Sequence, residues 1–182
     1  MPPVHSWLLK NDVISETTGN GNYTTIPKII YKVYIDKTGG FPSVDNMKST
    51  GRMVIAHRSW REMNPGYEVR YFNLDSCRQY LAYHFHPVFL RAFDCIEAFA
   101  GKVNLFRMCV VYVEGGWYSD WKQECLEENL LENLSKGAEF FGLWDWGQPR
   151  QQKCVQNYFF GATPQHFIVR ETLEKILLHV QA

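Results

Sequence analysis

The polar side chains in and just after one apolar segment are the strongest candidates for chemistry in this sequence. Residues 98–113 predict a buried helix that carries Asn104 and Arg107, and side chains three positions apart lie on the same helix face. A short strand over 117–121 then places Asp120 at its carboxyl end. A buried guanidinium is costly unless an anion meets it, so we expect Arg107 to contact either a ligand phosphate or Asp120 itself.

Strand and helix signals alternate around this segment, which positions these side chains. The expected strands are 29–35, 67–73, 117–121, 140–146 and 157–162; the expected helices are 44–63, 76–84, 87–95, 98–113, 126–134 and 163–180. We expect Asp75 to cap one helix, and Thr163 with Pro164 to cap the last. This order predicts an α/β fold with a central, mostly parallel sheet. Ligands of such sheets bind outside the carboxyl ends of the strands, so Asp120 is expected at the mouth of a cleft.

Composition narrows the function classes. Lys plus Arg and Asp plus Glu number 19 each, so no excess of positive charge predicts nucleic acid as a partner. No run approaches the ~18 apolar residues of a membrane helix, which predicts a soluble chain. Five widely spaced cysteines indicate reduced, mostly buried thiols, with one disulfide left open. Residues 1–25 are expected to form a loosely ordered lead-in, and residues 26–182 a single domain.

Several motifs resemble the glycosyltransferases whose sugar-binding region contains an Asp-x-Asp motif. Residues 102–107 read Lys-Val-Asn-Leu-Phe-Arg and residues 115–122 read Gly-Gly-Trp-Tyr-Ser-Asp-Trp-Lys. They are similar to that family's Lys-Ser-Asp-Leu-Leu-Arg and Gly-Gly-x-Tyr-x-Asp-x-Asp runs. Segments 26–31, 59–68 and 157–170 follow the same family order, which extends from yeast initiating mannosyltransferases to large clostridial glucosylating toxins. The resemblance implies a GT-A (Rossmann-like) nucleotide-sugar-binding fold over about residues 26–170.

The resemblance also implies a reaction and a site. The reaction is transfer of a hexose from a nucleotide-diphosphate sugar to an acceptor hydroxyl of a glycan or protein, with retained anomeric configuration. The nucleotide-sugar-binding residues would be Tyr34, which would stack on the base, with Asn104, Arg107 and Asp120. Lys122, which departs from the family pattern, is added to them because of its charge. No nucleophile is identified. The alternative is a catalytically degenerate module that binds a nucleotide sugar or a protein with the same fold. Two origins are expected: the chain is either a cytoplasmic protein or a fragment of a Golgi-type enzyme.

Three positions depart from the family pattern. Tyr31 replaces a histidine, Asn104 replaces the helix aspartate, and Lys122 replaces the second aspartate of Asp-x-Asp. The sequence also ends soon after His166, so we expect it to lack the family's C-terminal segments.

These departures leave the site three charges more positive than the family pattern. We therefore expect no cofactor or a weakly bound divalent cation, manganese or magnesium, on Asp120. Lys122 would meet the diphosphate directly as a point charge. If the segment stays extended, Asp120, Lys122 and Glu124 share a face, so Lys122 pairs with acidic neighbours or Glu124 replaces the lost ligand.

Other conspicuous residues have plainer interpretations. Tryptophans 117, 121, 144 and 146 are candidates either for a sugar platform or for the core. His84 and His86 are expected on the surface, because no third metal ligand lies nearby in the sequence.

Overall fold

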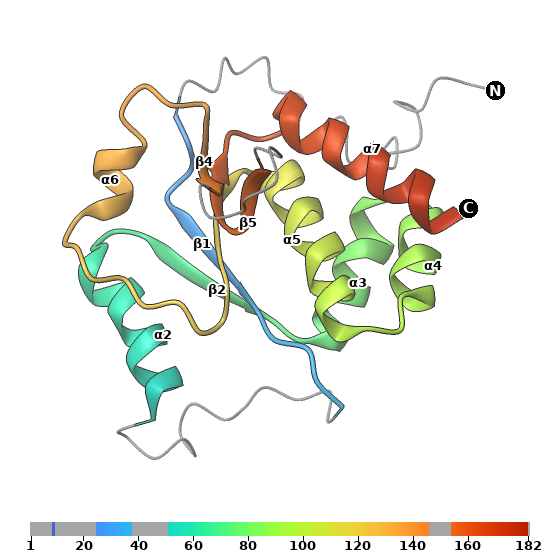
Figure 1. Ribbon diagram of the computed structural model, residues 1–182, viewed down its shortest axis with the longest axis horizontal. Coiled ribbons are helices and arrows are strands. Elements are labelled where there is room, and N and C mark those ends of the chain that lie inside the picture. Colours follow the sequence, from blue (N-terminus) through green and yellow to red (C-terminus); the bar gives the residue numbers. More distant parts are fainter. Residues whose placement is uncertain (1–8, 10–24, 38–50, 146–153, 182) are drawn as a thin grey trace.

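One mixed sheet runs through the part of the chain that the computed structural model describes, which is Leu9 and residues 25–37, 51–145 and 154–181 (Figure 1). The strand order is β2-β1-β3-β5-β4. The strands are β1 (Ile29–Val33), β2 (Glu68–Phe72), β3 (Gly116–Ser119), β4 (Phe140–Asp145) and β5 (Cys154–Ala162). β1 pairs in parallel with β2 and β3, whereas β5 is antiparallel to both β3 and β4. The predicted α/β fold with a mostly parallel sheet is confirmed.

Helices cover both faces of this sheet (Figure 1). One face packs against α3 (Leu74–His84), α4 (Pro87–Cys95), α5 (Phe99–Glu114) and α7 (Phe167–Gln181); the other meets α2 (Arg52–Met63) and α6 (Leu130–Leu134). Tyr31 and Val33 belong to the first core, whereas Ile30 belongs to the second. β1 is therefore buried on both sides, which explains its almost continuous apolar sequence.

The helix α5 is the central element of the larger core, and its bounds match the expected 98–113 to within one residue. The Lys102 ammonium that interrupts its apolar sequence donates to Phe93 O at 2.5 Å and to Asp94 O at 3.1 Å. These carbonyls lie at the C-terminal end of α4, where a cation is favourable. Gly115 then ends α5 with a φ of 67°, and an added Cβ would lie 2.6 Å from Pro164 Cδ. Glycine suits this conformation and this close approach.

Two predicted helix caps are wrong. Asn73, not Asp75, caps α3, because its side chain accepts from the Ser76 N–H while the Ser76 hydroxyl accepts from the Asn73 N–H. The last helix begins at Phe167, and the His166 imidazole rather than Thr163 or Pro164 accepts from the Ile168 N–H at 3.3 Å.

Other bounds shift without changing the element order. The helix expected over 44–63 is described from Arg52, and residues 44–50 lie outside the described residues. The helix expected over 126–134 is the shorter α6, and the strand expected over 157–162 begins earlier, at Cys154. Most of the expected lead-in lies outside the described residues, so the domain limits stay a prediction. All five cysteines are free thiols; Cys95 and Cys154 are exposed and the other three are buried.

Candidate functional site

The strand order creates a switch point between β1 and β3. From β1 the chain moves outward to β2, and it then crosses back through α3, α4 and α5 to place β3 on the other side of β1. In open α/β sheets the crevice at such a point, outside the carboxyl ends of the two strands, is where ligands bind. Tyr34 follows β1 and Asp120 follows β3, so both lie at this edge.

Tyr34 lies one residue beyond β1 and is held by the sheet. Its N–H donates to Phe72 O at 2.8 Å, and its ring packs on Trp121 with centroids 4.9 Å apart. Trp121 in turn contacts His57 edge to face at 4.0 Å and Tyr71 at 6.0 Å. Tyr34 is only partly buried, whereas Trp121 is 7% exposed. Tyr34 is thus the open end of an aromatic cluster whose inner members are core residues.

Asp120 and Arg107 form an ion pair, which is one of the two contacts predicted for the Arg107 guanidinium. Arg107 Nη1 lies 3.1 Å from Asp120 Oδ1, and the Tyr118 hydroxyl donates to the same oxygen at 2.7 Å. Arg107 is 5% exposed, donates to Asn157 O at 2.5 Å, and stacks 4.4 Å above the Tyr118 ring. The Asp120 side chain is 40% exposed, so the carboxylate that Arg107 neutralises stays accessible just beyond the carboxyl end of β3.

Asn104 and Lys122 lie apart from this pair. Asn104 Oδ1 accepts from Asn157 Nδ2 at 3.4 Å and lines a groove between α5, β5 and α7. Lys122 is exposed and forms no ion pair with a carboxylate of the described residues. The segment after β3 is a turn, closed by a hydrogen bond from Gln123 N to Asp120 O at 3.0 Å. The conditional alternation of Asp120, Lys122 and Glu124 on one extended face therefore does not hold.

Lys32 is the functional candidate that the sequence analysis missed. It is fully buried, and its ammonium donates to Ser119 Oγ at 2.8 Å, Asp120 O at 3.0 Å and Gln123 O at 3.5 Å. It also lies 4.7 Å over the Trp60 ring. Burial lowers the pKa of Lys32 to about 7, against the opposing effect of Asp120. A lysine in an otherwise apolar strand was the available signal, because a buried cation needs a dedicated partner.

His57 is a second residue that the sequence analysis missed. It is 3% exposed, and neither ring nitrogen has a hydrogen-bond partner among the described residues. Burial, with smaller effects of Lys32 and Arg61, lowers the pKa of His57 to about 4, which keeps the ring neutral. Within the described part of the chain, the indole N–H of Trp121 beside it also lacks a partner. Nothing in the helical pattern of α2 distinguishes this histidine from a core residue.

The tryptophan and histidine candidates from the sequence differ in how exposed their side chains are. Trp117 and Trp121 are buried, Trp144 is 56% exposed, and Trp146 lies outside the described residues. His86 is exposed, as expected, and its Nδ1 accepts from the Val88 N–H at 3.4 Å; His84 is half-buried against Tyr80.

The donor set does not fit a tightly held divalent ion. The hydrogen bond and the ion pair of the Asp120 carboxylate both fall on Oδ1, and the next position of the motif is a lysine. Among the described residues, no group of three His, Cys, Asp or Glu side chains could hold a metal ion. Magnesium and manganese prefer several oxygen ligands, and Asp120 alone supplies few.

Comparison with known proteins points to one family. Residues 51–140 match the family described as "Glycosyltransferase sugar-binding region containing DXD motif". An uncharacterized glycosyltransferase of Acanthamoeba polyphaga mimivirus is 26% identical over 115 residues, which are 63% of this chain and 42% of that protein. The PaToxG glycosyltransferase has a similar fold, with a TM-score of 0.64 at 15% identity over 94% of this chain and 67% of that one.

These three comparisons together support a GT-A-type glycosyltransferase family for this chain. The family resemblance predicted from the motifs is thereby confirmed. The chain spans less than half the length of the viral relative. Within the described residues, no helix is both long enough and apolar enough to cross a membrane.

Proposed function

We propose that this chain transfers a hexose from a nucleotide-diphosphate sugar to a hydroxyl of a glycan or protein acceptor, retaining anomeric configuration. One arrangement supports the proposal: beyond the carboxyl ends of β1 and β3, Tyr34 has a partly exposed ring that packs on Trp121, and Asp120, the residue before Trp121, has a carboxylate paired with Arg107. An aromatic face suits a nucleotide base, and a fixed carboxylate suits sugar hydroxyls.

The proposed roles follow from position and charge. Tyr34 stacks on the base, Asp120 accepts from ribose or sugar hydroxyls, and Asn104 meets a hydroxyl of the transferred sugar. The exposed ammonium of Lys122 lies two residues from Asp120 and meets the diphosphate, while the more deeply buried Arg107 supplies a second positive charge. Catalysis then rests on positioning and on stabilising the departing diphosphate.

Donor binding is proposed to be independent of a divalent ion, or only weakly enhanced by manganese or magnesium. Arg107 already neutralises Asp120, and Lys122 supplies a cation in place of the second acidic ligand. Local positive charge repels a dication and attracts a diphosphate. The charges that compensate the diphosphate would then come from the chain's own side chains.

Calorimetric titration of UDP- and GDP-sugars, with manganese and with a chelator, tests both proposals. The natural sequence is expected to bind one donor with similar affinity under both conditions. In Lys122→Asp, binding should become dependent on manganese, whereas the exposed control Lys136→Asp should behave like the natural protein. Donor binding that occurs only with a divalent ion would contradict metal independence, and no binding of any donor would contradict the proposed function.

A non-catalytic binding module of the same fold is the second candidate. Lys122 in the acidic motif favours it, because this departure concerns the ligands of the departing diphosphate. Release of free hexose from a bound nucleotide sugar, followed by chromatography, separates the two functions. An enzyme hydrolyses its donor slowly without acceptor, whereas a binding module leaves it intact. We also propose residues 26–182 as one domain, from a cytoplasmic protein or a fragment of a Golgi-type enzyme.

A further inference from the structure

An apolar groove of about 330 Å³ opens on the face of the sheet that α2 and α6 cover. Six apolar side chains line it: Trp60, Leu130, Leu134, Phe141, Leu143 and Phe159. All but Trp60 and Phe159 are only half-buried, because α6 is five residues long and leaves part of this face open. The volume is at the lower limit of small-molecule sites, roughly 300–1,000 Å³, so the groove suits one or two apolar side chains of a partner.

The segment that borders this groove is acidic. Gln123 and Glu124 at its start and Leu130 at its end line the groove, so residues 125–129 lie next to it. Residues 123–135 contain no lysine or arginine and four glutamates, which are Glu124, Glu127, Glu128 and Glu132. Lys28 pairs with Glu132 at 2.7 Å, whereas the other three glutamates are exposed and form no ion pair with a described residue. Three uncompensated carboxylates therefore accompany the groove.

The backbone of this acidic segment is anchored to α2 at two points. The Cys125 N–H donates to Ser59 Oγ at 2.9 Å, and the Asn129 N–H donates to Met63 O at 2.6 Å. Between these anchors Leu126 is 83% exposed, so an apolar side chain stands among the glutamates. A surface that is already ordered loses little conformational entropy when a partner binds.

An apolar groove beside uncompensated carboxylates restricts the class of ligand. Nucleotides, phosphates and anionic lipids are repelled by the three glutamates. A purely apolar ligand gains from leaving water but leaves the carboxylates without a partner. A segment that carries apolar residues between lysines or arginines matches both features, because complementary charges steer the encounter while the apolar groups supply the burial.

We propose that this groove docks a basic segment of another protein. One or two apolar side chains of that segment enter the groove between α6 and β4, and the flanking lysines or arginines meet Glu124, Glu127 and Glu128. No residue of this surface is among those proposed to bind the nucleotide sugar, so the docking does not rest on the proposed function.

Selection of short random peptides displayed on phage tests the proposal. The library is first depleted on the double variant Glu127→Lys with Glu128→Lys and then selected on the natural chain. We expect enriched peptides to combine lysine or arginine with leucine, methionine or an aromatic residue. The enriched peptides are synthesised, and calorimetry measures their affinities for the natural chain and its variants.

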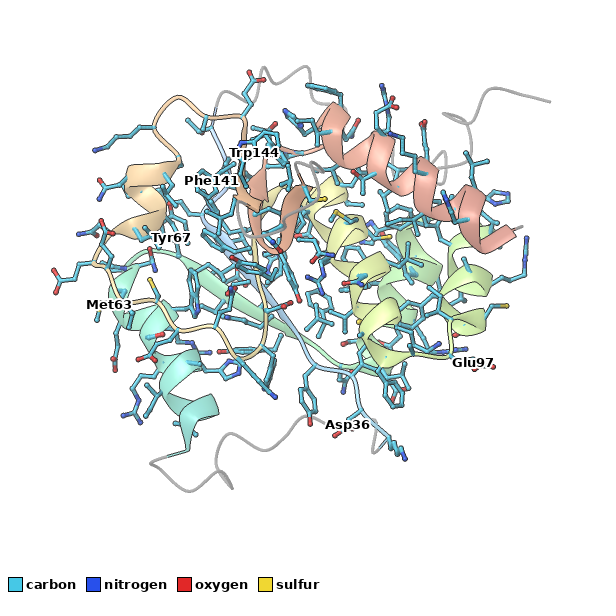
Figure 2. The ribbon with its side chains drawn as sticks, in the orientation of Figure 1. Asp36, Met63, Tyr67, Glu97, Phe141 and Trp144 are labelled. Atoms are coloured by element: carbon cyan, nitrogen blue, oxygen red, sulfur yellow. The ribbon has the colours of Figure 1, made fainter. Side chains whose placement is uncertain are left out.

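Replacing the apolar residues of an enriched peptide by serine should weaken its binding at least about tenfold, the loss expected of anchor residues. In the protein, Glu124→Lys should weaken binding about fivefold through charge and Leu134→Ala about fivefold through lost apolar contact. Glu97→Lys is the control for charge, since Figure 2 shows Glu97 far from Phe141 of the groove. Leu178→Ala, at an exposed leucine on α7, is the control for the apolar change. Both controls should bind the peptide like the natural chain.

Three results would overturn the inference. They are no enrichment after depletion, enriched peptides without basic residues, and equal binding of the serine-substituted peptide, which would mean attraction by charge alone. Urea unfolding checks that Leu134→Ala is folded, and the exposed Glu124→Lys decides the question if it is not. Nucleotide-sugar affinity, measured on the same samples, should be the same in Leu134→Ala as in the natural chain, so failure of the proposed function is recognised separately.

Discussion

Replacement of Lys32 by glutamine should remove a rise in stability with pH. Burial lowers the pKa of Lys32 from 10.5 to about 7, which corresponds to roughly 5 kcal/mol of difference between its two protonation states. The folded state therefore binds fewer protons than the unfolded state between these pKa values. Stability rises with pH wherever the unfolded state binds more protons. Integrated from about pH 7 to about pH 8.5, the expected gain is roughly 1–2 kcal/mol.

The other titratable groups with shifted pKa values change the free energy of unfolding mainly outside this pH range. Asp120 and Cys125 raise the pKa of Lys32, and the charge of Lys32 in turn helps to lower the pKa of His57 in α2. His57, with a pKa lowered to about 4, alters stability below pH 6.5. The buried thiols of Cys77 and Cys109 have raised pKa values and act near and above the ordinary thiol pKa of 9.0. Lys32 is thus the main expected contributor near pH 8.

Urea unfolding under reducing conditions, followed by tryptophan fluorescence at several pH values, measures the effect. The natural chain should gain stability between about pH 7 and about pH 8.5, and Lys32→Gln should show a flat profile. Lys136→Gln, which removes an exposed ammonium, should retain the rise. The reasoning is refuted if Lys32→Gln keeps the same rise, or if the natural chain loses stability across this window.

Two further predictions concern the base site and the core. Tyr34→Ala should weaken nucleotide binding by roughly 1–3 kcal/mol in calorimetry, the scale of base–aromatic stacking; unchanged affinity in a folded variant would remove Tyr34 from the site. Tyr83→Ala, at an exposed tyrosine on α3, is its control. Gly161→Ala should destabilise the fold by about 1–3 kcal/mol in urea unfolding, because the new Cβ would lie 2.6 Å from the Trp117 ring. Equal stability of this variant would mean that Trp117 can move.

The sequence alone predicted the element order, and it limited the expected partners of Arg107 to Asp120 or a ligand phosphate. Local apolar periodicity predicted α5, and its Gly-Gly ending predicted the adjoining strand β3. A buried arginine followed by a strand-end aspartate left only two partners for the guanidinium, and one of them is observed. These inferences hold because they depend on short spacings along the chain and on the cost of burying a charge.

Only the tertiary structure decided which distant residues meet. The ammonium of Lys32 reaches Ser119 across 87 positions of sequence, and Asn104 reaches Asn157 across 53 positions. The turn after Asp120 also depends on such contacts, since Lys32 and Trp60 both donate to Gln123 O. Spacing along the chain carries no record of these partners, because strand order and helix placement bring them together. The sequence therefore determined the candidate charges, and the fold determined that a buried lysine supports the turn that carries them.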